Sequence, residues 1–226
     1  MSRILLSFLM AMIASTSSAG AAPPLPFAPG ERFVYDISWS HFLTAGEGVL
    51  AVTGQTADAT GAPLYQLEIT GRTVGFVGSL YPVLDVTRSL FDVKRRRDLS
   101  CVITISENDY RKVKSIRFDR ERNVAVYKVD NDPEEEFEVG PDTQGPVSAL
   151  YVIRAMRDQM KPGAKVSVSL FDDRERYELE VQILRRETLD LPFGMTPTIV
   201  AQADLKTEGV FRRKGKMTVW FSDDAV

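Results

Sequence analysis

Few side chains in this sequence have the types and spacing that catalysis requires. His41 is the only histidine, so a Ser-His-Asp or Cys-His site would have to use it, and no motif surrounds it. Cys101 is the only cysteine and lies in an apolar run, which predicts a buried, inert thiol and excludes an intrachain disulfide. One histidine and one cysteine are also too few for a zinc site, which needs three or four ligands. The sequence therefore predicts no metal, no cofactor and no catalytic residue.

Carboxylates are the one catalytic resource present in number. Adjacent acids occur at Asp172-Asp173 and at Asp223-Asp224, and two carboxylates are what most glycosidases use. Both pairs lie in turn-like contexts, where acids are usually solvated. A hydrolase that acts on envelope glycan or ester through Asp223 and Asp224 stays open as an alternative.

Large apolar and aromatic side chains are the remaining candidates for a function. Most should belong to the core, but some could line an apolar cleft between a sheet and a helix. The candidate contacts to an apolar ligand or a protein partner are Trp39, Phe76, Tyr81, Tyr151 and Trp220. Phe76 and Tyr81 belong to a segment at 74–84 that glycine and proline interrupt, which predicts a structured loop or short helical turn. Its two interpretations are a plug that closes one end of the core and a ligand contact.

The first 21 residues have the organisation of a secretory signal peptide. Arg3 supplies the positive charge, residues 4–13 form an apolar run, and Ala19-Gly20-Ala21 fits the small-residue cleavage rule. The run is shorter than the roughly 20 residues that a membrane-spanning helix needs. We therefore expect residues 22–226 to be exported to the periplasm as a single β-rich domain with no membrane span.

Charge favours an ordinary soluble surface for the exported part. Removing residues 1–21 takes away Arg3 and no acid, so the net charge changes from −3 to −4. A nucleic-acid-binding domain would instead show a basic face. We expect no nucleic-acid partner.

One segment predicts a helix, at about residues 146–160. Gly145 can serve as the N-cap, and Pro146 suits the first helical position because its missing N–H would be unpaired there anyway. Arg154 and Arg157 lie near the end, where the helix dipole favours cations, and Pro162-Gly163 stops the helix. A single amphipathic helix must bury its apolar side, and only sheet is available for that here.

Nearly all other segments alternate between apolar and polar residues with a period of two. The pattern predicts a turn at 44–48, an acidic loop at 130–136 and strands at 32–39, 49–53, 64–70, 86–93, 99–107, 110–118, 123–129, 165–170, 177–184, 196–205, 210–212 and 217–221. One apolar and one polar face per strand is typical of antiparallel sheets. The fold class is therefore mainly β, with a large curved antiparallel sheet or open barrel and the helix packed on it.

A set of short motifs, in this order and spacing, resembles the exported bacterial proteins of domain of unknown function 3108. The resemblance runs from about Pro26 to the end of the chain. Its residues are Pro26-Phe27-x-Pro29-Gly30-Glu31, Tyr35, Trp39, Ala45-Gly46, Tyr81-Pro82, Ser148-Ala149-Leu150-Tyr151, Arg154, Leu191-Pro192-Phe193-Gly194, Gly209-x-Phe211, Lys214-Gly215, Trp220 and Asp223-Asp224. It implies a β-rich fold in the periplasm or outer envelope and no established activity. A long curved sheet with a helix is also similar to periplasmic carriers of lipids, which is an analogy of fold only.

This chain departs from the family pattern in two places. The helix in the family tends to start with Asp, where this chain has Gly145, a change that should cost only a few tenths of a kcal/mol of capping energy. The family also continues past Asp223-Asp224, so the resemblance implies that the last strands are missing and a sheet edge is open.

Three functions are compatible with the sequence. The first is a non-enzymatic periplasmic envelope protein that binds an apolar, lipid-like ligand. The second is an interaction or assembly module that uses an open sheet edge or the apolar segment at 76–81. The third is the carboxylate-dependent hydrolase.

Overall fold

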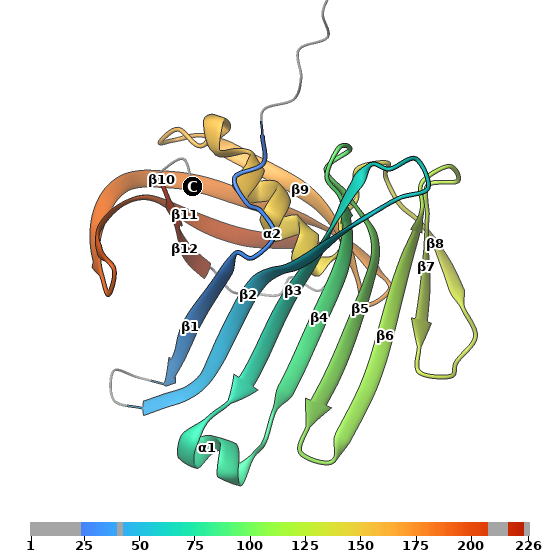
Figure 1. Ribbon diagram of the computed structural model, residues 1–226, viewed down its shortest axis with the longest axis horizontal. Helices are drawn as coiled ribbons and strands as arrows, with labels where there is room; N and C mark the ends of the chain where they lie inside the picture. The colour runs from blue at the N-terminus through green and yellow to red at the C-terminus, as the bar shows by residue number, and fades with distance from the viewer. Residues whose placement is uncertain (1–23, 40–42, 208–216, 224–226) are drawn as a thin grey trace, which may run out of the picture.

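Two antiparallel sheets enclose one helix in this protein, as a computed structural model that describes residues 24–39, 43–207 and 217–223 shows (Figure 1). The eight-stranded sheet follows chain order: β1 (Arg32–Trp39), β2 (Leu43–Ala57), β3 (Pro63–Thr73), β4 (Leu84–Asp92), β5 (Arg97–Glu107), β6 (Tyr110–Asp119), β7 (Val124–Val129) and β8 (Glu135–Glu138). The four-stranded sheet has the order β12-β11-β10-β9: β9 (Lys165–Asp172), β10 (Glu175–Leu191), β11 (Gly194–Thr207) and β12 (Met217–Ser222). The predicted fold class is confirmed, with the strands divided between two sheets.

Short turns explain why both sheets are meanders. Asp173 and Arg174 connect β9 to β10 and both have positive φ, 49° and 69°, as in the two-residue turn that best matches the twist of a hairpin. Asn108 and Asn123 provide single left-handed residues in two further turns, since asparagine tolerates that conformation. Such turns force consecutive strands to pair with each other.

The predicted turn at 44–48 is wrong, because β2 begins at Leu43 and runs through it. Gly46 and Gly48 suggested a turn, but both lie inside the strand, and Gly46 serves close packing within the sheet. A Cβ atom on Gly46 would lie 2.7 Å from the backbone oxygen of Arg72 on β3. Glycine inside a strand often marks such an approach.

Three other segments differ from the expectation or refine it. Residues 75–80 form a short helix, α1 (Gly75–Leu80), but none of its residues is buried, so the plug interpretation is wrong. The end of the predicted acidic loop is the edge strand β8. The predicted strand at 210–212 lies outside the described residues.

The helix α2 (Pro146–Ala155) contacts both sheets (Figure 1). Val147 and Tyr151 pack on the eight-stranded sheet together with Phe27 of the N-terminal arm. Ala149 and Ile153 pack on the four-stranded sheet. The helix therefore contributes to the core on two sides, which explains why it is apolar around most of its circumference. A further part of the core contains no helix residue, because Phe171 of β9 packs directly on β5, β6 and β7.

Regular helix ends five residues earlier than predicted. Met156 donates its N–H to the carbonyl of Ile153, which tightens the last turn, and the 3₁₀ turn η1 (Arg157–Gln159) follows. Gly163 has a positive φ of 87° in the turn that leads to β9.

Candidate functional site

Several residues of the family pattern meet in one ion-pair assembly that fastens the N-terminal arm to α2. Arg154 donates from both terminal nitrogens to the two carboxylate oxygens of Glu31, each at 2.7 Å, and both side chains are 15% exposed. Pro29 and Gly30 form the turn before Glu31, and Gly30 has a φ of +94°. The guanidinium also lies over the rings of Phe27, Phe33 and Tyr151.

Ser148, another family-pattern residue, belongs to a buried polar cluster that sequence reasoning missed. The Asp98 cluster consists of Ser89, Asp98, Gln144 and Ser148, all buried. Asp98 Oδ2 accepts hydrogen bonds from Ser148 Oγ at 2.8 Å and from Ser89 Oγ at 3.1 Å. The backbone N–H of Asp98 donates to Gln144 Oε1 at 3.0 Å.

The Asp98 carboxyl occupies the place where a side chain of the helix N-cap would normally lie. A Cβ atom on Gly145 would be only 2.4 Å from Asp98 Oδ2. Ser148 Oγ accepts the Gly145 N–H at 3.1 Å, so it links the start of the helix to the carboxyl. β5 thus brings the Asp98 carboxyl to the start of the helix through Ser148, and a glycine N-cap was the only sequence signal for it.

Burial raises the pKa of Asp98 from 3.8 to about 7, although the hydrogen bonds from Ser148 and Ser89 oppose this change. The side chain has no exposed surface, so no substrate can reach it as a general acid or base. The cluster is a structural element with a titrating group inside it.

Asp98 should make the protein less stable as pH rises. Because its pKa is higher in the folded state, the folded chain retains a proton that the unfolded chain releases between about pH 4 and pH 7. The free energy of unfolding should therefore decrease from about pH 5 to about pH 8, and Asp98→Asn should remove this decrease by keeping the acceptor oxygen without a charge. Urea denaturation of both proteins at the two pH values tests this; identical pH dependence would contradict it.

Asp223 is also held by arginines. Its side chain forms ion pairs with Arg157 at 3.4 Å and Arg186 at 3.2 Å, and Arg157 also donates to its backbone oxygen. This contact joins η1, β10 and the residue after β12, so the geometry is that of a structural link. Asp224 and His41 lie outside the described residues.

The five predicted ligand or partner contacts are not brought together. Tyr151 is fully buried, with its ring centroid 4.7 Å from that of Phe27. Trp220 is on β12, where its Nε1 donates to Glu187 Oε1 at 2.6 Å. Its side chain points to the opposite face of the strand from that of Phe221, which packs against the core. Phe76 and Tyr81 lie on and just after α1 and are exposed. Trp39 ends β1, and its side chain lies outside the described part.

The inner face of the eight-stranded sheet, defined as the face that carries α2, remains uncovered beyond the helix. Directly opposite residues share a face in antiparallel sheets, so the register identifies rows across the strands. One row is buried and contains Val52, Leu67, Ser89, Cys101, Ile116 and Tyr127. The helix covers its Val52 and Leu67 end, and Phe171 of β9 covers its Ile116 and Tyr127 end. The next row is only partly covered and contains Phe33, Leu50, Ile69, Thr87 and Ile103.

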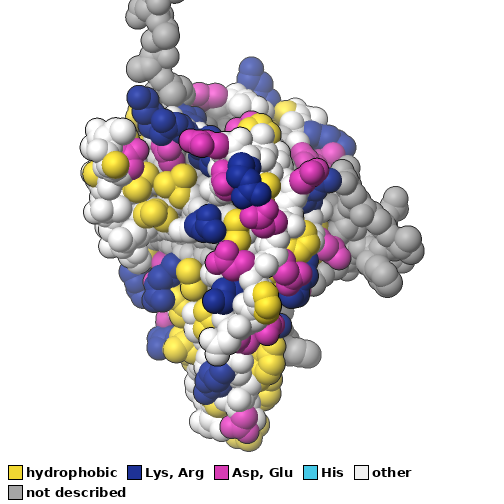
Figure 2. Space-filling view, turned by 90° about the vertical axis from the view of Figure 1, so that its right-hand side faces the viewer, with side chains coloured by type: hydrophobic (Ala, Val, Ile, Leu, Met, Phe, Trp, Pro, Cys, Tyr) yellow, Lys and Arg dark blue, Asp and Glu magenta, His cyan; other side chains and the backbone are white. Residues whose placement is uncertain are grey.

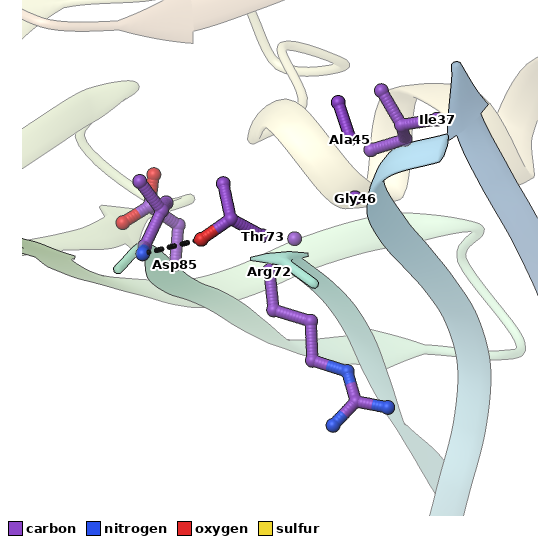
Figure 3. A pocket seen from close by; sticks show the side chains of 8 residues that line it. Ile37, Ala45, Gly46, Arg72, Thr73 and Asp85 are labelled. Atoms are coloured by element: carbon purple, nitrogen blue, oxygen red, sulfur yellow. Dashed lines mark hydrogen bonds between the residues drawn. The ribbon is translucent and has the colours of Figure 1, made fainter. Parts of the chain in front are cut away.

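A hollow of about 210 Å³ continues this inner face towards α1 (Figure 3). The third row places Tyr35 and Asp85 at its ends, with Gly48 and Gly71 between them. A Cβ atom on Gly71 would meet no atom within 4 Å, so the absence of a side chain there creates open space. The hollow is lined by Ile37, Ala45, Gly46, Gly71, Arg72, Thr73, Val83 and Asp85.

Thr73 connects the hollow to α1. Its Oγ1 donates to the Tyr81 carbonyl at 2.9 Å and accepts the Val83 N–H at 2.9 Å, the bond drawn in Figure 3. Arg72 points away from the other labelled side chains in that view, and it pairs with Glu47 at 2.9 Å. The hollow therefore presents apolar groups and backbone, with Asp85 as the carboxylate at its edge.

Outer surfaces differ from the inner face by their ion pairs. On the outer face, Arg88 pairs with Glu68 at 2.7 Å. Figure 2 shows cationic and acidic side chains interspersed on the side formed by the later strands of the sheet, where Arg122 pairs with Glu136 and Arg174 with Glu135. This side has no field of a single sign.

Membrane-spanning helices and metal-ligand clusters are both absent from the residues that the structure describes. No helix among them combines the length and apolarity that crossing a membrane requires. None of their histidine, cysteine and carboxylate side chains gather in threes as metal ligands would.

Comparison with known proteins identifies a family and a solved structure to which this chain is similar. Residues 34–226 match the family model DUF3108, described as a protein of unknown function. None of the curated proteins matches the chain. A solved structure, the β-barrel-like protein of domain of unknown function DUF1849 from Brucella abortus, is similar over 77% of this chain and 78% of that chain, with 11% sequence identity and a TM-score of 0.49.

Proposed function

The chain belongs to the DUF3108 family, and from that premise we propose that it is an exported, non-enzymatic protein of the cell envelope that binds an apolar, acyl-chain-like ligand. The ligand would lie along the uncovered part of the inner face. The signal-like residues 1–21 support the location.

One observation carries the proposal, which is the contrast between the two faces of the same strands. The inner face continues from the helix as a partly exposed row of Phe33, Leu50, Ile69, Thr87 and Ile103 and then opens into the hollow at Gly71. The outer face of those strands carries the pairs Arg72–Glu47 and Arg88–Glu68. Apolar surface that is left uncovered beside a hollow is a common mark of a binding site.

The size of the hollow limits the mode of binding. Sites that enclose a drug-sized ligand usually have about 300 to 1,000 Å³, and this hollow has about 210 Å³. An acyl chain would therefore place one end in the hollow and extend along the row towards α2. Exposed Phe76 and Tyr81 are near the end that opens to solvent, because α1 follows Thr73 directly.

Filling the hollow should prevent binding. Gly71→Leu places a side chain in the open space without a clash, so the fold should persist while affinity for a fluorescent fatty acid falls by at least about tenfold. Thr70→Leu is the matched control, because the adjacent position on β3 faces outwards and pairs with Val86.

Native mass spectrometry of gently purified protein provides the independent check. A bound mass in the lipid range that is present in the wild type and in Thr70→Leu, and absent in Gly71→Leu, supports the proposal. A protein that carries no lipid and shows no change in probe fluorescence contradicts it.

A further inference from the structure

The edge strand β1 is exposed along both faces although its sequence is that of a buried strand. Each residue from Arg32 to Ser38 is exposed, including the apolar side chains Phe33, Val34, Tyr35 and Ile37 at 39–52%. In the described part of the chain β1 pairs only with β2, so its other side presents free backbone N–H and C=O groups.

The opposite edge of the same sheet is protected in the usual ways. β8 has only four residues, three of which are glutamates. β1 has eight residues and contains neither lysine nor proline. A long edge strand that is mostly apolar and carries only one cation and one anion is a site for pairing with another strand.

We propose that β1 pairs with β1 of a second copy of this chain, antiparallel and centred on Val34. This register places Arg32 of one copy opposite Asp36 of the other, twice by symmetry. Among the described residues, neither Arg32 nor Asp36 has an ion-pair or side-chain hydrogen-bond partner within its own chain. The same register places Phe33 opposite Tyr35, an aromatic pair of the kind that stabilises neighbouring strands.

Charge complementarity selects this register from its neighbours. Centring on Phe33 would place Arg32 opposite Val34, and centring on Tyr35 would place Asp36 opposite Val34. Both alternatives leave the charges unpaired. The irregularity between Ile37 and Ser38 ends the regular pairing surface on that side.

A dimer with a two-fold axis perpendicular to the sheet keeps the same face inward in both copies. The eight-stranded sheets would join into one continuous sheet. This inference does not rest on the proposed ligand, because it depends on the edge of the sheet and not on the hollow.

Charge reversal tests the register. Arg32→Glu and Asp36→Arg should each weaken dimerisation by about tenfold or more, because each places like charges opposite each other, and the double variant should restore it. Analytical ultracentrifugation of the purified protein over a concentration series measures this. Recovery in the double variant excludes loss of folding as the cause of weakening in the single variants.

Crosslinking tests the symmetry axis. Val34→Cys should form a disulfide-linked dimer on mild oxidation, because residues opposite each other in antiparallel strands have Cα atoms about 4.5 to 5.5 Å apart, within disulfide range. Asp36→Cys is the control and should not crosslink to itself, and Cys101 is buried in both variants. A monomer at every concentration, or a dimer unaffected by charge reversal, would overturn the proposal.

Discussion

Replacing Gly145 by Asp is expected to destabilise this protein by about 3 kcal/mol or more. The new Cβ atom would lie 2.4 Å from Asp98 Oδ2 and 3.2 Å from the Cβ atom of Cys101. The second carboxyl would also be buried beside the first, so that the nearby Arg120, which already donates to the Asp98 backbone oxygen, would face two carboxyl groups. Capping preference alone would predict that Gly145→Asp stabilises the protein, since Asp is a better N-cap than Gly.

A second substitution separates the crowding from any general intolerance at this position. Asp98→Ala leaves room for the new side chain, and the carboxyl of Gly145→Asp can then accept the helix N–H groups itself. The double variant should therefore be more stable than Gly145→Asp alone, although each single change is destabilising. Urea denaturation of the four proteins gives the coupling energy. Additive losses would show that the Asp98 carboxyl does not occupy the space that a side chain at position 145 needs.

The second large effect is expected at the ion pair between the arm and the helix. Arg154→Ala should cost about 3 kcal/mol, because it leaves Glu31 mostly buried without a partner and removes the cation over the rings of Phe27 and Tyr151. The arm at 24–31 should also become accessible to proteases. Limited proteolysis and urea denaturation measure the two consequences.

Two matched variants make this prediction specific. Arg88→Ala removes an ion pair of the same 2.7 Å distance, made through a single nitrogen on the exposed outer face, and it should cost no more than about 1 kcal/mol. Combining Arg154→Ala with Glu31→Ala should cost less than the sum of the single changes, since no charge is then left unpaired. A loss as small as that of Arg88→Ala would show that the arm is not fastened by this pair.

The sequence by itself determined the elements whose signals are local. Alternation predicted the strands around Val166–Leu170 and Tyr177–Ile183, and Gly145-Pro146 predicted the start of the helix. It also predicted the buried thiol of Cys101. These predictions succeed because side-chain direction has a period of two in a strand and 3.6 in a helix, which a short segment already shows.

Tertiary structure alone decided which faces are covered. Phe33 and Ile199 both lie in alternating segments, but β1 is an edge beyond the helix whereas β11 lies within the core. Asp98 follows four basic residues at 94–97, a pattern that indicates a solvated turn. In the structure, β4, β5 and α2 bury it completely. In the sequence, Gly46 and Gly48 suggest a turn, and Gly71 shows no relation to them. The register of β2 and β3 makes the three glycines neighbours.

The physical reason is that alternation states which residues share a face, and burial depends on what lies against that face from elsewhere in the chain. Here one helix covers only the first rows of an eight-stranded sheet, so identical patterns lead to a core near Val52 and an open surface near Tyr35. The Asp98 cluster lies where α2 covers the sheet, and the hollow lies where that cover ends.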